Sequence, residues 1–280
     1  MSAVHTDLVC PCGSARYTQV LKADRYCVYG GAVENLEYSL LRCSSCGLVR
    51  TWPMPEHAEH EPFRDDSFIA AYQKRPALYE HYLGRVVREM TAQKAPPGRL
   101  LDVGANIGTL VGLAARAGYD ATGLELNLAG VEFAQAQGLD VRCSTLEEAG
   151  FDPGSFDVVS MSAVAEHVPD LPETLAHCRD LLKPDGLLHI SNSPNYAGFG
   201  ARYEKDLWYG IQPTGHVWQY TPKTLRFHVE RAGFKVVGIS TYNLHRDFGP
   251  GKKERARKVL FAAAERLGMG DALSVGAIKR

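Results

Sequence analysis

Strand-length apolar runs alternate with helical segments through most of the chain that follows Arg99. The segments between these runs have the apolar spacing and terminating glycines of helices. The predicted strands lie in the runs LLDVG, DATGLEL, DVRCS, FDVVSMS and LLHISNS. This alternation predicts a mainly parallel sheet with helices on both faces, an α/β fold of the doubly wound, Rossmann-like type. Such sheets bind ligands at the carboxyl ends of their strands, where we therefore expect the functional residues.

A glycine-rich turn, DVGANIG at residues 102–108, follows the first of these strands. Glycine lets the backbone turn tightly and approach a ligand closely, but such a turn alone is compatible with several nucleotide ligands. Asp102, directly before the first glycine, would repel a pyrophosphate and attract an ammonium group. Glu125 ends the second strand, at the position that binds ribose hydroxyls, with a helix cap as its alternative role. The pair favours a nucleoside with a cationic amino-acid tail over a dinucleotide.

Five of the seven cysteines lie in the first 46 residues, and four of them form two close pairs. The pairs are Cys10 with Cys12 and Cys43 with Cys46. Two pairs separated by a hairpin favour tetrahedral zinc, whereas a disulfide framework fits poorly with a chain that shows no secretory signal. The first pair is one residue closer than usual, which leaves open that Cys27 or a histidine replaces Cys12 as a ligand.

We therefore expect three regions along the chain. Residues 1–55 form a small zinc ribbon, with a strand over residues 32–42 that leads into the second cysteine pair. Residues 56–97 are a linker and a helical segment, because TWPMPEHAEHEP is rich in proline and residues 67–90 have helical apolar spacing. Residues 98–280 form the α/β domain, with an insertion at 190–222. A ribbon of this size needs its metal for folding free energy.

The charge balance constrains the partners. The formal net charge is −1 and the sequence pI is near 6.8, whereas nucleic-acid binders usually have a basic domain. The basic residues at 252–258 alternate with apolar and acidic ones, which favours a solvated helix face. No apolar run approaches the length that crosses a bilayer, and the N-terminus lacks signal-peptide features. We expect a cytoplasmic protein that partners with neither nucleic acid nor membrane.

The chain from about Arg99 onward resembles a class I S-adenosylmethionine (SAM)-dependent methyltransferase. The matching segments occur in the family's order, and the region from about Arg99 to the end that the resemblance covers is nearly two thirds of the chain. They are LDVGANIG, GLEL, VRCSTLEEAGF, SFDVVSMSAVAEHVPDL, LLKPDGLLHISNSPN and HVWQYTPKTLRFHVERAGFKVV. The front end resembles that of methyltransferases acting on deoxysugar nucleotides and natural-product intermediates, without the long C-terminal extension of the sugar C-methylating members. The resemblance implies SAM as cofactor and a small-molecule acceptor.

The resemblance also implies residues that bind the methionine and ribose parts of the cofactor. Gly104 and Ala105 would line the methionine moiety, and Asp102 would anchor its amino group through neighbouring backbone or water. Glu125 would accept hydrogen bonds from both ribose hydroxyls, a charge-assisted contact.

The remaining cofactor residues implied by the resemblance lie around the adenine and in the turn. Leu126 would pack on the adenine, and Thr145 and Leu146 would flank its edge. Asn106 and Gly108 complete the glycine-rich turn, with Asn106 where the family usually has glycine.

Methyl transfer to a hydroxyl needs a base that titrates usefully near neutrality, which favours histidine. His167 follows the fourth strand at the ligand edge, and His216 lies in the insertion. Each has packing or loop bracing as its alternative role. The insertion also holds seven aromatic residues without helical periodicity, which predicts a pocket wall in part and core in part. Asn192 and Asn195, around the end of the fifth strand, are candidates for holding polar acceptor groups.

Three functions compete. The first is methylation, most simply O-methylation, of a sugar, nucleotide-linked or natural-product intermediate. The second is RNA methylation with the ribbon gripping RNA, which the net charge and the ribbon's Asp24, Glu34 and Glu37 disfavour. The third is a SAM-binding or zinc-organised protein without turnover, which the intact turn and Glu125 disfavour, although these residues imply binding only.

Overall fold

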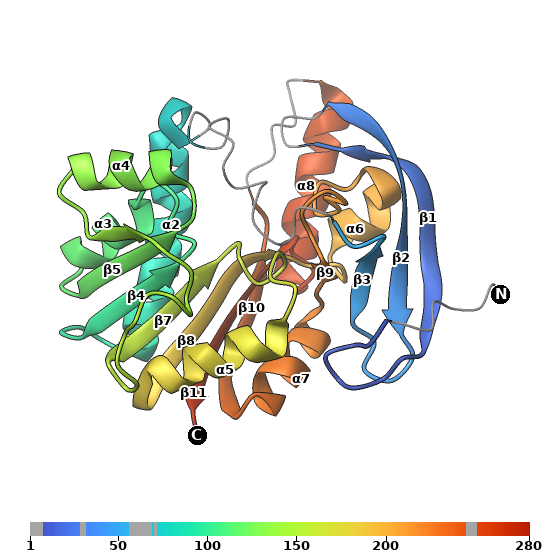
Figure 1. The fold of residues 1–280 in the computed structure, drawn as a ribbon. Coiled ribbons are helices and arrows are strands. Elements are labelled where there is room, and N and C mark those ends of the chain that lie inside the picture. The colour runs from blue at the N-terminus through green and yellow to red at the C-terminus, as the bar shows by residue number, and fades with distance from the viewer. Residues whose placement is uncertain (1–7, 29–31, 56–68, 70–71, 245–250) are drawn as a thin grey trace.

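The computed structural model describes residues 8–28, 32–55, 69, 72–244 and 251–280. These residues form two sheets that lie next to each other (Figure 1). The larger sheet, flanked by helices, occupies the left and centre of the view, and a smaller antiparallel sheet from the N-terminal part stands at the right.

The larger sheet has the order β10-β11-β8-β7-β4-β5-β6. Its strands are β4 (Arg99–Val103), β5 (Asp120–Glu125), β6 (Val141–Cys143), β7 (Phe156–Ser162), β8 (Leu182–Pro194), β10 (Phe234–Tyr242) and β11 (Ala272–Lys279). The pairs among β4 to β8 are parallel, and β11 is antiparallel to both of its neighbours. The order reverses at β4, so the turn after this strand lies at the point where such sheets bind ligands. The predicted α/β class is confirmed.

Helices cover both faces of this sheet, as predicted. One face is covered by α2 (Pro76–Gln93) and α3 (Thr109–Arg116), whose apolar sides share a core with β4, β7 and β8. The other face is covered by α5 (Leu171–Leu181) and α7 (Pro222–Arg231). The helix α4 (Leu128–Ala136) packs beside β5 and β6. Each buried stripe follows from apolar residues three and four positions apart.

Polar caps fix where several of these helices begin. The Asn127 side chain accepts from the backbone of Ala129 and Gly130 to start α4, so Asn127 rather than Glu125 is the cap there. Thr221 and Thr224 form a capping box at the start of α7.

The helix α5 is followed directly by β8. The helix ends at Leu181, and β8 begins at Leu182. Pro184 lacks a backbone N–H and disfavours helical geometry at Lys183, which explains the switch to extended chain.

The smaller sheet has the order β1-β2-β3-β9. Its strands are β1 (Tyr17–Cys27), β2 (Val33–Cys43), β3 (Val49–Trp52) and β9 (Trp218–Gln219). The predicted strand at 32–42 corresponds to β2. The linker predicted to begin at Thr51 is corrected, because Thr51 and Trp52 belong to β3. Residues 56–62 of that linker, and part of the helical segment predicted at 67–90, lie outside the described residues.

The insertion is built into the N-terminal sheet. Its strand β9 pairs with β3, and its Trp208 is fully buried against Tyr26 and Tyr38 of the β1–β2 hairpin. Tyr203, by contrast, is 52% exposed. Several insertion aromatics therefore form core, and the predicted boundaries at residues 55, 98, 190 and 222 separate regions that share hydrophobic contacts.

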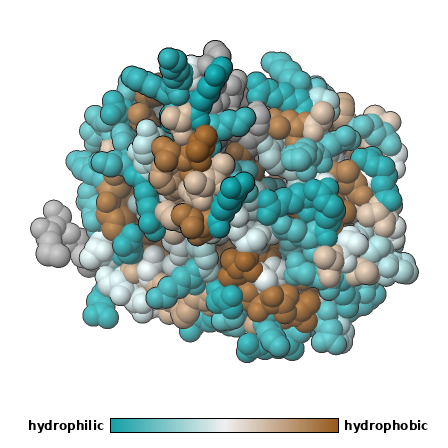
Figure 2. Space-filling model, turned by 180° about the vertical axis from the view of Figure 1, so that it is seen from behind, coloured by the Kyte–Doolittle hydropathy of each residue, from teal (hydrophilic) through white to brown (hydrophobic). Residues whose placement is uncertain are grey.

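The helix α8 (Lys252–Arg266) carries the basic cluster on an exposed face, as the sequence predicts. It packs on α6 (Phe199–Glu204), where Arg257 donates to Glu204 at 2.9 Å. Val259 and Leu260 are exposed on the same helix. Figure 2 shows the face of the molecule turned away in Figure 1, where apolar patches lie among hydrophilic side chains. Within the described part, every helix is too short or too polar to cross a membrane.

Candidate functional site

The turn after β4 has the backbone shape that a closely approaching ligand needs. Gly104 has φ +74°, and a Cβ there would lie 2.5 Å from the Val164 side chain. Gly108 has φ +77° and begins α3. Asn106 has φ 51°, in the left-handed region that asparagine tolerates better than most residues. This explains how asparagine serves at a position where the resemblance leads us to expect glycine.

Asp102 is the penultimate residue of β4, next to this turn, and is 2% exposed. Its Oδ1 is buried and makes no hydrogen bond with the described residues. Burial raises the pKa of Asp102 to about 7, and the nearby Glu125 charge adds to the rise, against a hydrogen bond from Ser160. A buried acceptor without a partner is costly. An ammonium group reached directly or through water would satisfy it.

Glu125 ends the neighbouring strand β5 with its carboxylate held by backbone N–H groups. Oε2 accepts from Asn106 N at 2.7 Å, and Oε1 accepts from Leu126 N at 2.7 Å and Asn127 N at 2.8 Å. Oε1 already accepts two of these bonds, and Oε2 keeps acceptor capacity, which suits a ribose hydroxyl. Together with the unpaired Asp102 oxygen and the Gly104 cradle, this donor set fits SAM.

The residues predicted around the adenine lie on loops after β5 and β6, and these two strands pair with Glu125 opposite Cys143. Leu126 is half-buried, and Leu146 is largely buried in the main core. The Thr145 hydroxyl accepts from Glu148 N at 3.1 Å and so braces the loop. Their roles toward adenine stay predictions.

Tyr72, which the sequence reasoning did not single out, lies near the two site carboxylates. The carboxylates of Asp102 and Glu125 both act on the Tyr72 hydroxyl, whose pKa is raised chiefly by burial. Its ring stacks on Tyr79 at a centroid distance of 3.7 Å. The only sequence signal was an apolar position in a helical pattern, which does not distinguish a cofactor wall from core.

The two candidate catalytic histidines meet in space, although 49 positions separate them in the sequence. Their rings pack edge to face with centroids 4.6 Å apart. Nδ1 of His167 faces the Gly215 carbonyl at 3.1 Å, and Nδ1 of His216 faces the Gly210 carbonyl at 2.8 Å. A carbonyl only accepts, so each Nδ1 carries the proton and each Nε2 is the proton acceptor of its ring.

Burial keeps both imidazoles neutral. Burial lowers the pKa of His167 well below its usual range, with His216 adding to the effect and the Gly215 carbonyl opposing it. Burial likewise lowers the pKa of His216 to about 4, and its Nε2 is buried without a hydrogen-bond partner. A neutral imidazole is the form that can take a proton, but a pKa this far below neutrality makes each ring a weaker base than the sequence criterion asked for.

Glu166 is a second residue that the sequence reasoning passed over, although it stands directly before His167. It is 1% exposed, accepts from the Ser193 hydroxyl at 2.7 Å, and has its pKa raised to about 7 by burial. One ligand atom from each of Glu166, His167 and His216 lies within 4.8 Å of the others, a donor set that suits a divalent cation. The Glu-His pair was a signal, but only the tertiary fold adds His216.

The two asparagines differ. Asn192, with φ 58°, donates to the Ser162 hydroxyl at 2.7 Å and accepts from the Tyr242 hydroxyl at 2.8 Å, at the ligand edge of β7 and β8. Asn195 is buried, with its amide donating to Gly270 O and its oxygen accepting from Ala197 N. These bonds favour a bracing role for Asn195.

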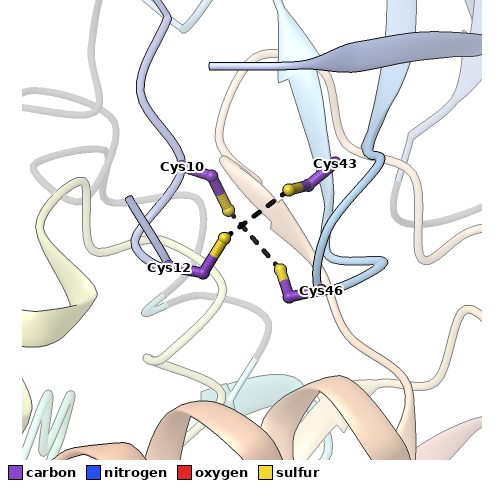
Figure 3. Close-up of side chains that lie close together, drawn as sticks. All are labelled: Cys10, Cys12, Cys43 and Cys46. Atoms are coloured by element: carbon purple, nitrogen blue, oxygen red, sulfur yellow. Dashed lines mark hydrogen bonds between the residues drawn. The ribbon is translucent and has the colours of Figure 1, made fainter. Parts of the chain in front are cut away.

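The four paired cysteines converge at one end of the N-terminal sheet (Figure 3). Sγ of Cys10 lies 3.6 Å from that of Cys46, and the same distance separates Cys12 from Cys43. Tetrahedral zinc with Zn–S bonds of about 2.3 Å holds its sulfurs about 3.8 Å apart. The four thiols are free, and these distances fit zinc rather than disulfides.

The short first pair does not displace Cys12, which joins the other three sulfurs. Cys27, the alternative ligand, ends β1 and donates to Val28 O instead. Backbone N–H groups reach the sulfurs, as Leu48 N does to Cys46 at 3.5 Å. Burial opposes ionisation of Cys43, but hydrogen bonds from backbone N–H groups and neighbouring thiols lower its pKa to about 7. These contacts favour the thiolate of Cys43, whereas burial raises the pKa of the Cys10 and Cys46 thiols.

The seven-stranded sheet, the glycine turn and the ribose-type carboxylate define a SAM-dependent methyltransferase. The chain belongs to the family of methyltransferase domains, which matches residues 71–239. A ubiquinone biosynthesis O-methyltransferase of Marinobacter nauticus is 33% identical over 165 residues, covering 52% of this chain and 68% of that protein. Further relatives of the same name are matched over about half of their length.

Solved structures share the fold at low sequence identity. A SAM-dependent methyltransferase from Archaeoglobus fulgidus superposes with a TM-score of 0.57 at 21% identity, covering 77% of this chain and all of that one. The magnesium protoporphyrin IX methyltransferase of Synechocystis gives 0.52 at 15% identity, covering 78% and 93%. These similarities establish the class of fold.

Proposed function

We propose that the protein transfers a methyl group from SAM to a hydroxyl group of a small-molecule acceptor. The acceptor class is a sugar, nucleotide-linked or natural-product intermediate. The observation that carries the proposal is the pair of neutral histidines at the ligand edge of β7, His216 buried and His167 partly exposed, with the Glu166 carboxyl beside them. The O-methyltransferase relatives support a hydroxyl as the acceptor group.

The bound cofactor supplies an already activated methyl group on a sulfonium. The protein's residues hold that cofactor and align the acceptor, which can contribute several kcal/mol to catalysis. Asp102, the turn at Gly104 and Glu125 hold its amino-acid and ribose parts. The acceptor approaches from the side of His167, across the ends of β7 and β8.

His167 acts as the general base. Its Nδ1–H donates to the Gly215 carbonyl, which fixes the ring, and Nε2 is the atom that takes the hydroxyl proton. His216 packs against the ring and holds it in place. The nearby Glu166 carboxyl, with its pKa of about 7, can share the positive charge that forms on the imidazole.

Methyl-labelled SAM with purified protein tests this proposal against acceptor panels and a small-metabolite extract. We expect label in a nuclease-resistant, low-molecular-weight fraction, in a product that resists mild acid and base as an ether does. Label lost after RNase treatment would replace the proposal with RNA methylation. Cofactor binding without transfer to any fraction would favour a protein without turnover.

We also propose that Cys10, Cys12, Cys43 and Cys46 bind one zinc ion, which stabilises the N-terminal sheet. Metal analysis of the purified protein should find one zinc per chain. The Cys43→Ser variant should lose it, whereas Cys143→Ser, on an exposed cysteine far from the cluster, should retain it. Equal zinc content in both variants would contradict this assignment.

A further inference from the structure

Arg50 is a buried cation without a carboxylate partner. It lies in β3, is 6% exposed, and its Nε makes no hydrogen bond with the described residues. No ion pair joins it to an acidic side chain in the part of the chain that the structure describes. Its guanidinium lies over the Trp218 ring, 5.4 Å from the centroid. Burying an uncompensated charge is costly, so a compensating anion is expected nearby.

The strand register brings this cation near the cysteine cluster, because Arg50 pairs with Leu41, two positions before Cys43, and Tyr17 pairs with Cys43 itself. The Tyr17 hydroxyl is also buried and makes no hydrogen bond with the described residues. It is close enough to Cys10 and Arg50 for both to act on its pKa. Four neutral thiols would give Arg50 no compensating charge. Four thiolates around one Zn²⁺ carry a net double negative charge, which Arg50 would offset through Tyr17 and across a short distance.

A second donor reaches the cluster from the methyltransferase domain. His228 of α7 places its Nε2 3.6 Å from Sγ of Cys46 and is 4% exposed. The helix α7 lies between the two sheets in Figure 1. An N–H aimed at a metal-bound thiolate stabilises its charge and orients the ligand.

The strand that carries Arg50 also holds the segment of the insertion around His216. The next residue, Thr51, donates its hydroxyl to the His216 carbonyl at 2.6 Å and its backbone N–H to Val217 O at 3.0 Å. Arg50 and Val49 pair in register with Trp218 and Gln219 of β9. A shift of β3 would therefore move the backbone of His216.

We infer that Arg50 and His228 are the outer-shell partners of a zinc tetrathiolate, and that zinc, by holding Arg50 in β3, positions His216 in the acceptor site. This inference rests on the zinc site and the histidine pair proposed above. Both residues are positioning residues, because neither contacts the reacting atoms. Zinc then does more than stabilise the small N-terminal sheet. The charge of its thiolates holds Arg50 in β3, and β3 in turn holds His216 in the acceptor site.

Zinc affinity by chelator competition tests the charge compensation. Arg50→Met removes the charge but keeps an apolar stem, and we expect about 10- to 100-fold weaker zinc binding. Arg50→Lys keeps the charge and should remain within a few-fold of the wild type. His228→Phe should weaken binding about 10-fold, and His228→Gln, which keeps a donor, should restore most of it.

The zinc-free protein gives a result of opposite sign. Without zinc, Arg50→Met should raise the unfolding midpoint, because it removes an uncompensated buried charge, whereas with zinc it should lower the midpoint. A residue that only packs would lower both midpoints. Equal zinc affinity in wild type and Arg50→Met would overturn the inference while leaving the zinc site itself in place.

Hydrogen exchange tests the connection to the catalytic loop. Zinc removal, or Arg50→Met in the loaded protein, should speed amide exchange in peptides covering residues 47–53 and 215–221, with residues 120–136 as the unaffected control. Unchanged exchange in both peptides would overturn the positioning of His216. A protein that purifies and folds without any zinc overturns the zinc proposal as well, and the methyl-transfer assay judges the proposed activity separately.

Discussion

The cofactor side and the acceptor side of the site are assembled in different ways. The turn and the carboxylate of the cofactor side come from one stretch of chain, residues 102–125, and bond directly to each other through Asn106 N and Glu125. The acceptor side draws His167 and His216 from distant segments, and β3 of the N-terminal sheet braces the second of them. Changes on the acceptor side should therefore lower turnover without affecting SAM binding, and changes on the cofactor side should affect SAM binding first.

The largest effect should come from the proposed base. His167→Ala should lower kcat by about 10²- to 10⁴-fold, the usual contribution of a positioned base, and leave the Kd for SAM unchanged. Steady-state kinetics with calorimetric SAM binding would measure both. His177→Ala, on an exposed histidine of α5 paired with Glu147, is the matched control. Wild-type kcat in His167→Ala would remove His167 as the base.

The cofactor carboxylate should show the reverse pattern. Glu125→Gln turns an amide N–H₂ toward backbone donors that now bond a carboxylate, and it removes the charge that ribose hydroxyls would bond. We expect SAM binding about 10- to 100-fold weaker, from hydrogen bonds to a charged group worth about 1.5–3 kcal/mol. Calorimetry measures this, with Glu132→Gln on the exposed side of α4 as control. If Glu125→Gln instead lost turnover at saturating SAM and kept its affinity for SAM, the contrast between the cofactor side and the acceptor side would fail.

The pH dependence of SAM binding should report Asp102. Its pKa of about 7 means that the carboxyl is largely protonated at pH 6 and ionised at pH 8 in the free protein. Because the ammonium group favours the ionised form, SAM affinity should rise about tenfold from pH 6 to pH 8 and level off above the pKa. Asp102→Asn should show a flatter profile. A wild-type affinity that falls across this interval would contradict the role given to Asp102.

Tyr72 should give the smallest effect. Tyr72→Ala removes a ring that lies near both cofactor carboxylates, and the loss should weaken SAM binding about 2- to 10-fold, as expected for one aromatic contact. Titration of the variant beside Tyr203→Ala, which alters an exposed tyrosine, isolates the effect. A change in acceptor KM with unaltered SAM affinity would move Tyr72 to the acceptor side.

Local patterns predicted one half of the site better than the other. The turn, Asp102 and Glu125 stand out in sequence because backbone sterics and strand ends fix them within one βαβ unit. Tyr72 and Glu166 were passed over because a buried tyrosine or a carboxylate beside a histidine has many structural roles. The role of Cys12 was left open by spacing alone, and the structure places it with the other three cysteines.

The sequence by itself determined the α/β class, the cofactor turn and the residues of a metal cluster, since these depend on periodicity, glycine geometry and short ligand spacing. Only the tertiary structure decided that β9 completes the N-terminal sheet, that His167 packs on His216, and that Arg50 lies buried beside the thiols. The reason is physical. Contacts between distant segments depend on how complete sheets and helices pack, and on which buried charges need a partner, and neither is set by neighbouring residues.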